Sequence, residues 1–229
     1  MSGIAAVLFD LDGTLVDSAP DLAGAANEML GARGLEPMPY AQLRGHAGSG
    51  ARGMVGQAFG CAPGQPGYEA LKDEFLARYE QRLLRLTRVF DAVPALLDAL
   101  AARGLPWGVV TNKAEFLARP LVAAMGWHAQ AGSLVGGDTT PHRKPHPAPL
   151  LEAARRLGVA PAACVYVGDD ARDIAAGRAA GMATLAAAWG YLGEPADPAA
   201  WGADGVASAP QQLPALMAAL QIDRAARRG

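Results

Sequence analysis

The sequence lacks several features that mark whole classes of protein. Its two cysteines, Cys61 and Cys164, lie far apart without the spacing of a metal site, and its four histidines show no ligand spacing either. We therefore expect neither a zinc centre nor a disulfide. No apolar run is long enough to span a membrane, because glycine or charged residues interrupt each one. The N-terminal segment has no basic region typical of a signal peptide, so we expect a cytoplasmic protein.

Charge is also scarce and nearly balanced. Only 18% of the residues are charged, and the formal net charge is −2. This balance predicts no nucleic-acid or membrane partner, although a local cluster of cations can still bind a small anion. Hydrophobic residues make up 51% of the 229 positions, which is enough to bury a sizeable core in one domain or in a domain with a smaller insert.

Short apolar runs alternate with helical patterns over most of the chain. The apolar runs are residues 4–9, 107–110, 133–135, 164–167 and 183–188. The helical patterns between them are residues 94–103, 114–125, 147–157 and 173–180. This alternation predicts βαβ units and an α/β fold with a Rossmann-like parallel sheet. In such sheets ligands bind at the carboxyl ends of the strands.

Residues 17–87 do not follow the alternation and are mainly helical in pattern. Helical spacing over residues 21–32 and 69–86 flanks a glycine-rich stretch at residues 45–60. We therefore expect an all-helical cap domain, residues 17–87, inserted into a catalytic core. The core consists of residues 1–16 and 88–229.

Asp10 and Asp12 directly follow the first apolar run, in the sequence Asp-Leu-Asp-Gly-Thr. Residues two apart in an extended segment point the same way, so both carboxylates can face one pocket. Close carboxylates repel each other, and a hard, oxygen-rich site that compensates them favours Mg²⁺. The alternative is a turn capped by Asp. The following Gly13 and Thr14, so close to a buried strand, favour a functional motif.

A second acidic group, Asp169, Asp170 and Asp173, follows the run at residues 164–167. Asp169 comes immediately after the predicted strand and is the better candidate for a direct metal ligand. For Asp170 and Asp173, metal contact and capping of the next helix remain open alternatives.

Three further residues are candidates for binding an anion. Thr111 and Asn112 stand at the start of a predicted helix, where free N–H groups bind anions, although both are also ordinary N-caps. Lys144 lies among prolines and histidines in a constrained loop just before another helix. There it can offer a point charge to a phosphoryl group.

Together these segments resemble the haloacid dehalogenase superfamily of aspartate-nucleophile phosphatases, and their order covers nearly the whole chain. The helical insert resembles the cap of the phosphoglycolate phosphatase-like branch. Three short stretches, residues 49–55, 107–113 and 201–204, are similar to bacterial N-acetylmuramic acid 6-phosphate phosphatases. Asp170 departs from the usual pattern, in which a small Ser or Asn is common.

The resemblance implies a role for each matching residue. Asp10 is the nucleophile and a metal ligand, and Asp12 is the general acid and base whose backbone carbonyl also reaches the metal. Mg²⁺ is further held by Asp169, with Asp173 assisting. The phosphoryl oxygens are held by Thr111, Asn112 and Lys144. The implied reaction is hydrolysis of a small phosphorylated metabolite, such as phosphoglycolate, through an aspartyl phosphate.

The glycine-rich stretch carries four polar residues that are candidates for substrate selectivity: Arg44, His46, Ser49 and Arg52. An exposed polar loop is the alternative interpretation of this stretch. The oligomeric state, monomer or homodimer, stays open, as does the choice between phosphoglycolate and an amino-sugar phosphate as substrate.

Two other functions use a similar set of residues. A signalling receiver domain also places acidic strand ends, Mg²⁺, a Thr and a Lys around a phosphorylated Asp, but receivers are smaller and lack a cap and an acid corresponding to Asp12. A phosphosugar mutase shares every core residue, so only its products distinguish it. A dehalogenase is disfavoured, because Asp12 and the lysine-plus-carboxylate set suit phosphate and metal.

Overall fold

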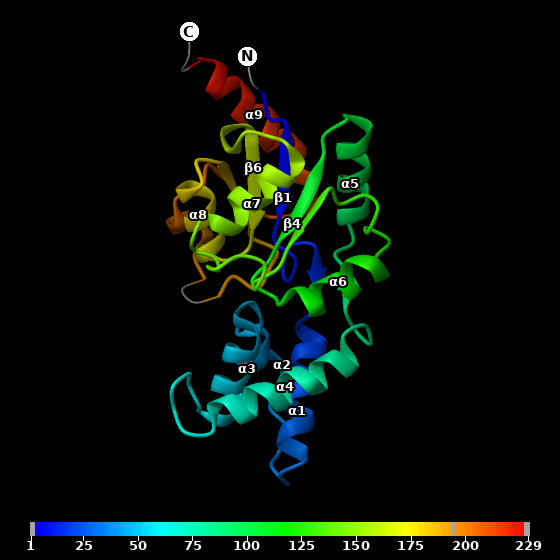
Figure 1. The fold of residues 1–229 in the computed structure, drawn as a ribbon, viewed down its shortest axis with the longest axis vertical. Helices are drawn as coiled ribbons and strands as arrows, with labels where there is room; N and C mark the ends of the chain where they lie inside the picture. Colours follow the sequence, from blue (N-terminus) through cyan, green and yellow to red (C-terminus); the bar gives the residue numbers. More distant parts are fainter. Residues whose placement is uncertain (1–2, 194–195, 227–229) are drawn as a thin grey trace.

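The computed structural model describes residues 3–193 and 196–226, and a six-stranded parallel sheet lies at its centre (Figure 1). The strands are β1 (Ala6–Phe9), β4 (Trp107–Val110), β5 (Ser133–Val135), β6 (Cys164–Gly168), β7 (Ala183–Ala187) and β8 (Gly205–Ala207). Their order is β5-β4-β1-β6-β7-β8, and all neighbours pair in parallel. The predicted α/β fold is confirmed. Strand β8 is additional; it lies at the edge of the sheet and only its last residue, Ala207, is buried.

Helices cover both faces of the sheet. They are α5 (Val93–Ala102), α6 (Glu115–Ala124), α7 (Ala148–Leu157), α8 (Ala171–Ala179) and α9 (Leu213–Ala226). Because successive side chains of a strand point to opposite faces, β1 supplies both layers. Val7 and Phe9 belong to the apolar core shared with α5, α6 and α9, and Leu8 to the core shared with α7 and α8. Residues buried on both faces explain why these strands read as continuous apolar runs.

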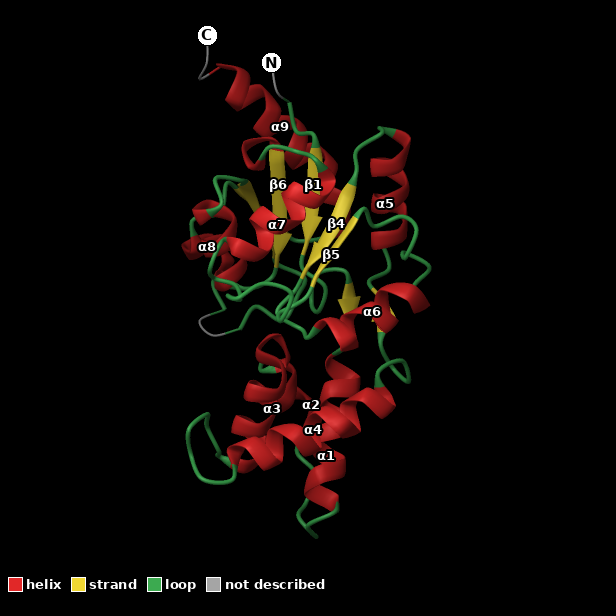
Figure 2. Ribbon diagram, viewed as in Figure 1, coloured by secondary structure: helices red, strands yellow, loops and turns green. Residues whose placement is uncertain are grey.

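Four further helices form a separate layer beyond the carboxyl edge of the sheet (Figure 2). This helical layer consists of α1 (Ala19–Gly31), α2 (Tyr40–Arg44), α3 (Gly50–Phe59) and α4 (Tyr68–Arg82). Helix α4 ends four residues before the predicted boundary, and Leu86 beyond it is 50% exposed. The glycine-rich stretch is largely helical, since α3 lies inside it.

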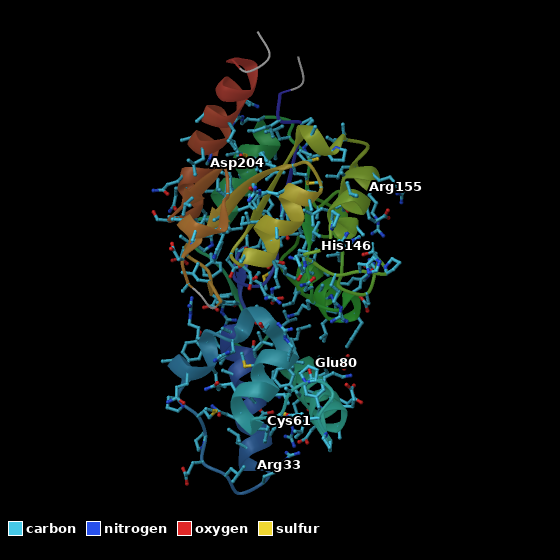
Figure 3. All side chains as sticks on the ribbon, turned by 90° about the vertical axis from the view of Figure 1, so that its left-hand side faces the viewer. Arg33, Cys61, Glu80, His146, Arg155 and Asp204 are labelled. Atoms are coloured by element: carbon cyan, nitrogen blue, oxygen red, sulfur yellow. The ribbon has the colours of Figure 1, made fainter. Side chains whose placement is uncertain are left out.

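Two short strands join the helical layer to the sheet. They are β2 (Val16–Asp17) and β3 (Arg88–Val89), which pair antiparallel where the chain leaves the core and where it returns. Short 3₁₀ turns complete the fold at η1 (Ala47–Ser49), η2 (Pro161–Ala163), η3 (Pro198–Trp201) and η4 (Pro210–Gln212). In the view from the side, Asp204 and Arg155 mark the core and Cys61, a free thiol, marks the helical layer (Figure 3). No helix in the described ranges is both long and apolar enough to cross a membrane.

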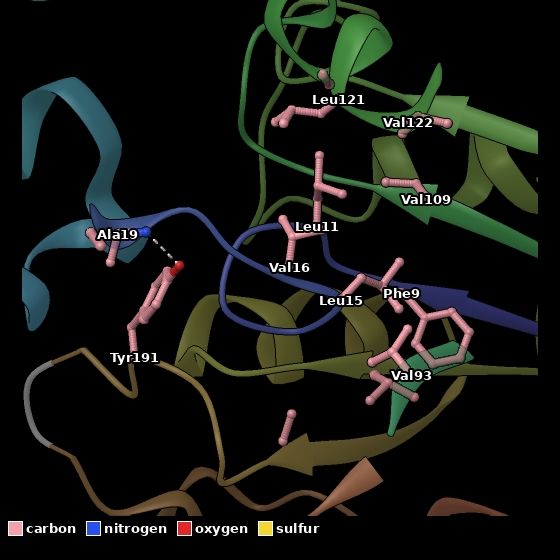
Figure 4. Packing of buried hydrophobic residues seen from close by; sticks show 14 of the residues in the cluster. Phe9, Leu11, Leu15, Val16, Ala19, Val93, Val109, Leu121, Val122 and Tyr191 are labelled. Carbon is pink, nitrogen blue, oxygen red and sulfur yellow. Dashed lines mark hydrogen bonds between the residues drawn. The ribbon is translucent and has the colours of Figure 1, made fainter. Parts of the chain in front are cut away.

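The loop after β1 is fixed by its apolar residues. Leu11, Leu15 and Val16 are buried in the core beside Phe9 (Figure 4). The backbone closes on itself, with the Val16 N–H donating to the Leu11 carbonyl at 3.0 Å. The Tyr191 hydroxyl accepts from the backbone N–H of Ala19 at 2.9 Å, which ties the start of α1 to the core. The loop therefore cannot move independently of the sheet.

Asp21 of α1 anchors the returning segment of the chain. It is completely buried, and its Oδ2 accepts from the backbone N–H groups of Leu86 and Thr87, both at 2.8 Å, and from the Thr87 hydroxyl at 2.9 Å. Three donors thus depend on one carboxylate oxygen, next to the junction of the helical layer and the core.

Replacing Asp21 with Ala should destabilise the protein strongly, because the buried N–H and hydroxyl groups of Thr87 and the partly buried N–H of Leu86 would lose their acceptor. We expect the free energy of unfolding to fall by roughly 2–5 kcal/mol, measured by urea denaturation. The control is Asp73→Ala on α4, whose side chain is 72% exposed, with an expected change within about 0.5 kcal/mol. Equal effects of the two substitutions would contradict the anchoring role.

Candidate active site

Asp10 and Lys144 meet at the carboxyl edge of the sheet, although 134 positions separate them in the chain. Asp10 directly follows β1, and Lys144 lies in the loop between β5 and α7. The Lys144 Nζ donates to Asp10 Oδ1 at 2.7 Å and lies 2.8 Å from Asp173 Oδ1. Lys144 is only 5% exposed, so this ammonium group is placed between two carboxylates inside the protein.

Two neutral oxygens complete the surroundings of the Lys144 ammonium group. Its Nζ also contacts the Tyr166 hydroxyl at 2.7 Å and the Val110 carbonyl at 3.0 Å. Tyr166 belongs to β6 and bonds in turn to Val110 and Asp173. A flexible lysine side chain is thereby held in one direction by partners from three strand ends.

Asp169 lies beside Asp10, at the end of β6. Its Oδ1 accepts from the Thr14 hydroxyl at 2.9 Å, and its Oδ2 accepts from the Tyr191 backbone N–H at 2.8 Å. Glycines make room for this carboxyl group: a Cβ on Gly13 or Gly190 would lie 2.1 or 2.2 Å from an Asp169 atom. Gly13 also has φ +89°, a conformation that other residues adopt at a cost.

Asp10, Asp169 and Asp173 form a buried acidic cluster whose ligand oxygens all lie within 4.8 Å of one another. Burial, opposed in part by Lys144, raises the pKa of Asp10 to about 7. Burial and the neighbouring Asp10 raise the pKa of Asp169 well above its usual range. Three carboxylates around one ammonium group leave uncompensated negative charge, and an all-oxygen donor set suits a hard divalent cation. The cluster therefore fits a metal ion.

Asp12 does not join the acidic cluster with its side chain. Its Oδ1 accepts from the Ser18 hydroxyl at 2.5 Å, and both of its oxygens accept from Lys113 Nζ, at 3.0 and 3.1 Å. Lys113 Nζ also donates to the hydroxyl of Tyr79 on α4 at 2.8 Å. Asp12 thus lies in the same pocket as Asp10 but has partners of its own.

Asn112 is bonded to the backbone of Lys144. Its amide Nδ2 donates to the Lys144 carbonyl and its Oδ1 accepts from the Lys144 N–H, both at 3.0 Å. The Asn112 side chain therefore orients the lysine loop. Any contact from Asn112 to a phosphoryl group would have to come from the Asn112 backbone. Thr111 is 2% exposed, and its Oγ1 accepts from the Lys113 N–H at 3.1 Å.

For Asp170 and Asp173, helix capping and metal contact were the two alternatives, and the structure gives the two residues different positions. Asp170 is the N-cap of α8 and accepts from the Arg172 N–H, whereas Asp173 both accepts from the Asp170 N–H at 3.2 Å and belongs to the acidic cluster. Burial works to raise the pKa of Asp170, but the Arg172 guanidinium group outweighs it and lowers the pKa. Arg172 also donates to the Gly48 carbonyl at 2.8 Å, which links the core to the helical layer.

A cavity of about 510 Å³ separates the acidic cluster from the helical layer. Of the four selectivity candidates, Ser49 and Arg52 line it. Arg44 does not line this cavity: it donates to the Gly190 carbonyl at 3.3 Å and lies over the Tyr191 ring, which fastens the helical layer to the core. His46 lies outside the set of described residues that line the cavity.

Several residues of the site escape the sequence analysis: Ser18, Tyr79, Lys113, Tyr166 and Tyr191. Lys113 carries a usable signal, since it directly follows Thr111 and Asn112 at a strand end. Tyr79 lies at helical spacing with apolar residues and reads as an ordinary core position. Its contact with Lys113 is visible only once the helical layer is placed on the sheet.

Comparisons with known proteins agree with these motifs. A model of the haloacid dehalogenase-like hydrolases matches residues 4–181. The chain is 50% identical over 208 residues to a phosphoglycolate phosphatase of Xanthomonas campestris pv. campestris, covering 91% of this chain and 94% of the relative. It is 43% identical over 208 residues to an N-acetylmuramic acid 6-phosphate phosphatase of Pseudomonas aeruginosa, covering 91% and 92%. The solved structure of a predicted phosphoglycolate phosphatase from Haemophilus somnus 129pt gives a TM-score of 0.83 at 29% identity, covering 94% and 99%.

The raised pKa of Asp10 predicts how the metal-free protein responds to pH. The unfolded chain releases this proton near its ordinary pKa of 3.8, whereas the folded chain holds it until about 7. The folded state therefore binds more protons between these values, and its stability falls as pH rises through this window.

We expect the melting temperature in EDTA to fall between pH 5 and pH 7.5, and added Mg²⁺ to raise it more at the higher pH, because protons compete with the metal. Differential scanning fluorimetry at both pH values checks this. The variant Asp10→Asn should have a smaller slope in EDTA. A melting temperature that rises with pH in EDTA, or equal effects of Mg²⁺ at both pH values, would contradict the assignment.

Proposed function

This chain belongs to the haloacid dehalogenase-like hydrolase family, and from that premise we propose that it is a Mg²⁺-dependent phosphatase of small phosphomonoesters. The observation that carries the proposal is the meeting of Asp10, Lys144, Asp169 and Asp173 in one buried cluster at the strand ends. A buried, net-negative cluster costs folding free energy, which favours a functional role over a purely structural one.

The acidic cluster would hold the metal in this proposal. Asp10, Asp169 and Asp173 offer carboxylate oxygens, and Asp12 offers its backbone carbonyl. When bound, Mg²⁺ would supply the positive charge that the three carboxylates lack and would keep Asp10 ionised at neutral pH.

Asp10 attacks the phosphorus atom of the substrate and forms an aspartyl phosphate, while the bond between phosphorus and the leaving oxygen breaks. Asp12 donates its proton to that oxygen, so an alcohol departs. Asp12 then takes a proton from water, whose oxygen attacks the aspartyl phosphate, and this releases inorganic phosphate and regenerates Asp10. Lys144 and Thr111, with the backbone of Asn112, hold the phosphoryl oxygens in place.

The helical layer serves as the cap domain, residues 17–87, on a core of residues 1–16 and 88–229. It closes the cavity, excludes water from the aspartyl phosphate and contacts the leaving group. Ser49 and Arg52 remain candidates for selectivity because they line the cavity. The cavity and Asp12 favour a phosphatase over a receiver domain, because a receiver lacks both a cap and an acid at the position of Asp12. In this proposal the enzyme is cytoplasmic, acts on a small phosphorylated metabolite and has no nucleic-acid or membrane partner.

Two substrates compete within this proposal, phosphoglycolate and N-acetylmuramic acid 6-phosphate. Relatives named for each cover over nine-tenths of the chain. The cavity of about 510 Å³ favours the larger one, since a volume of this order holds a drug-sized ligand. Both molecules carry a carboxylate in addition to the phosphate, close to it in phosphoglycolate and on the lactyl group at the other end of the amino sugar. Arg52 is a suitable partner for it, since it has no ion pair with the described residues.

Replacing Asp10 with Asn should remove the nucleophile and lower phosphate release from p-nitrophenyl phosphate with Mg²⁺ by roughly 10³-fold or more. The control is Asp98→Asn on α5, an exposed carboxylate on the core, which should leave turnover unchanged. Undiminished turnover in Asp10→Asn would remove the proposed mechanism. With a sugar phosphate as substrate, conversion to an isomeric sugar phosphate without release of inorganic phosphate would instead indicate a mutase.

Replacing Arg52 with Gln should weaken recognition of the substrate carboxylate. We expect kcat/KM for N-acetylmuramic acid 6-phosphate to fall about 10–100-fold, the equivalent of one charge-assisted hydrogen bond. N-acetylglucosamine 6-phosphate lacks the lactyl carboxylate and is the matched control, so its kcat/KM should change little. Arg52→Lys should retain part of the preference. Equal losses on both sugars would exclude Arg52 as the carboxylate partner.

A further inference from the structure

Lys113 links an acid of the core to a tyrosine of the cap, and the mechanism above gives it no role. It follows β4 in the core, and its Nζ donates to both oxygens of Asp12 at 3.0 and 3.1 Å and to the Tyr79 hydroxyl of α4 at 2.8 Å. Its side chain is 6% exposed and that of Asp12 is 13% exposed. The three hydrogens of the ammonium group are thus matched by three acceptors away from bulk water.

We propose that Lys113 is a positioning residue that directs the Asp12 carboxyl group toward the leaving oxygen, and that Tyr79 makes this arrangement depend on the cap being seated on the core. The inference rests on the proposed function, because it assumes that Asp12 is the general acid and base. It concerns where the carboxyl group points and does not depend on its proton affinity.

The Asp12 carboxyl group is held by two residues, Ser18 at the junction with the cap and Lys113 of the core. Ser18, the residue before α1, donates to Oδ1 at 2.5 Å. Lys113 donates to both oxygens of Asp12, and Tyr79 of the cap in turn contacts the Lys113 ammonium group. Without these contacts the carboxyl group could rotate, and a misplacement of about 1 Å in a catalytic group can lower the rate by roughly 10²-fold.

Tyr79 is a rigid support for the Lys113 ammonium group. Its side chain is 1% exposed, and its ring stacks on Phe75 with centroids 6.1 Å apart and planes inclined by 14°. The Lys113 Nζ also lies 4.5 Å from the centre of the Tyr79 ring. Lysine has a long flexible stem, so fixing its charged end requires partners that do not move. If the cap moves away from the core, Lys113 loses such a partner.

The same contacts can serve both halves of the reaction. An ionised Asp12 offers two accepting oxygens to Lys113, and a protonated Asp12 still offers one while its O–H faces the leaving group. The contacts from Lys113 therefore keep the Asp12 carboxyl group in place before and after proton transfer. This differs from a purely structural ion pair, which would stabilise the fold without affecting any particular step.

The dependence of kcat/KM on the leaving group distinguishes a positioning role of Lys113 from that of a purely structural ion pair. An alkyl ester needs a proton on its leaving oxygen, whereas p-nitrophenolate departs without one. The value of kcat/KM reports only steps up to release of the leaving group, so the later base role of Asp12 does not enter it. The probes are p-nitrophenyl phosphate and whichever of phosphoglycolate and N-acetylmuramic acid 6-phosphate the unmodified enzyme hydrolyses with the higher kcat/KM.

For Lys113→Met we expect kcat/KM for the alkyl ester to fall about 10–100-fold and that for p-nitrophenyl phosphate less than about threefold. Asp12→Asn is the benchmark and should show the same pattern with a larger loss. Tyr79→Phe keeps the ring stack, removes the hydroxyl group and should give the same selective loss at smaller size. If circular dichroism shows that Lys113→Met does not fold, Lys113→Gln replaces it.

Each outcome decides one part of the inference. Equal losses on both substrates in the lysine variant mean a structural ion pair and overturn the positioning role. A selective loss in the lysine variant with no effect of Tyr79→Phe overturns the dependence on the cap. If Asp12→Asn shows no selectivity for the leaving group, the acid assignment in the proposed function fails instead.

Discussion

The structure depends on an imbalance of charge at the carboxyl edge of the sheet. Asp10, Asp169 and Asp173 are buried within reach of one another, and Lys144 is the ammonium group placed among them. Burying like charges is unfavourable unless something compensates them, and the raised pKa values of Asp10 and Asp169 express that strain. A divalent metal ion can relieve it by supplying the missing positive charge. The same feature that destabilises the metal-free site therefore makes it a good binding site.

Small and neutral groups surround the charged side chains of the site. Gly13 and Gly190 leave space for the Asp169 carboxyl group, and Thr14 and the Tyr191 N–H hold its two oxygens. Asn112 plays the corresponding part for the lysine loop by bonding to its backbone on both sides. The charged groups are thus oriented by neutral partners, which add no further repulsion.

Polar contacts around the cavity connect the helical layer to the core, in addition to the buried apolar cluster that extends through both. Arg172 reaches the Gly48 carbonyl, Arg44 reaches the Gly190 carbonyl, and Lys113 reaches Tyr79. Contacts of this kind can exchange with water at modest free-energy difference, unlike a large apolar interface. In the proposed function, such contacts would let the helical layer open to admit a substrate and then close over it. The Asp12 side chain is also linked to the helical layer through Lys113 and Tyr79.

The sequence by itself determined the parallel α/β fold, because apolar runs of strand length alternate with helical periods and end in polar motifs. It also indicated that Asp10 and Asp169 belong to one site, since strand ends of a parallel sheet share an edge, and the family resemblance added Lys144 from a loop. Only the tertiary structure decided how the side chains divide their work. Asn112 turns to the lysine backbone, Asp170 caps α8, and Asp12 is held by Lys113. These choices rest on contacts between distant segments, such as that of Tyr79 with Lys113, for which neighbouring residues carry no local signal.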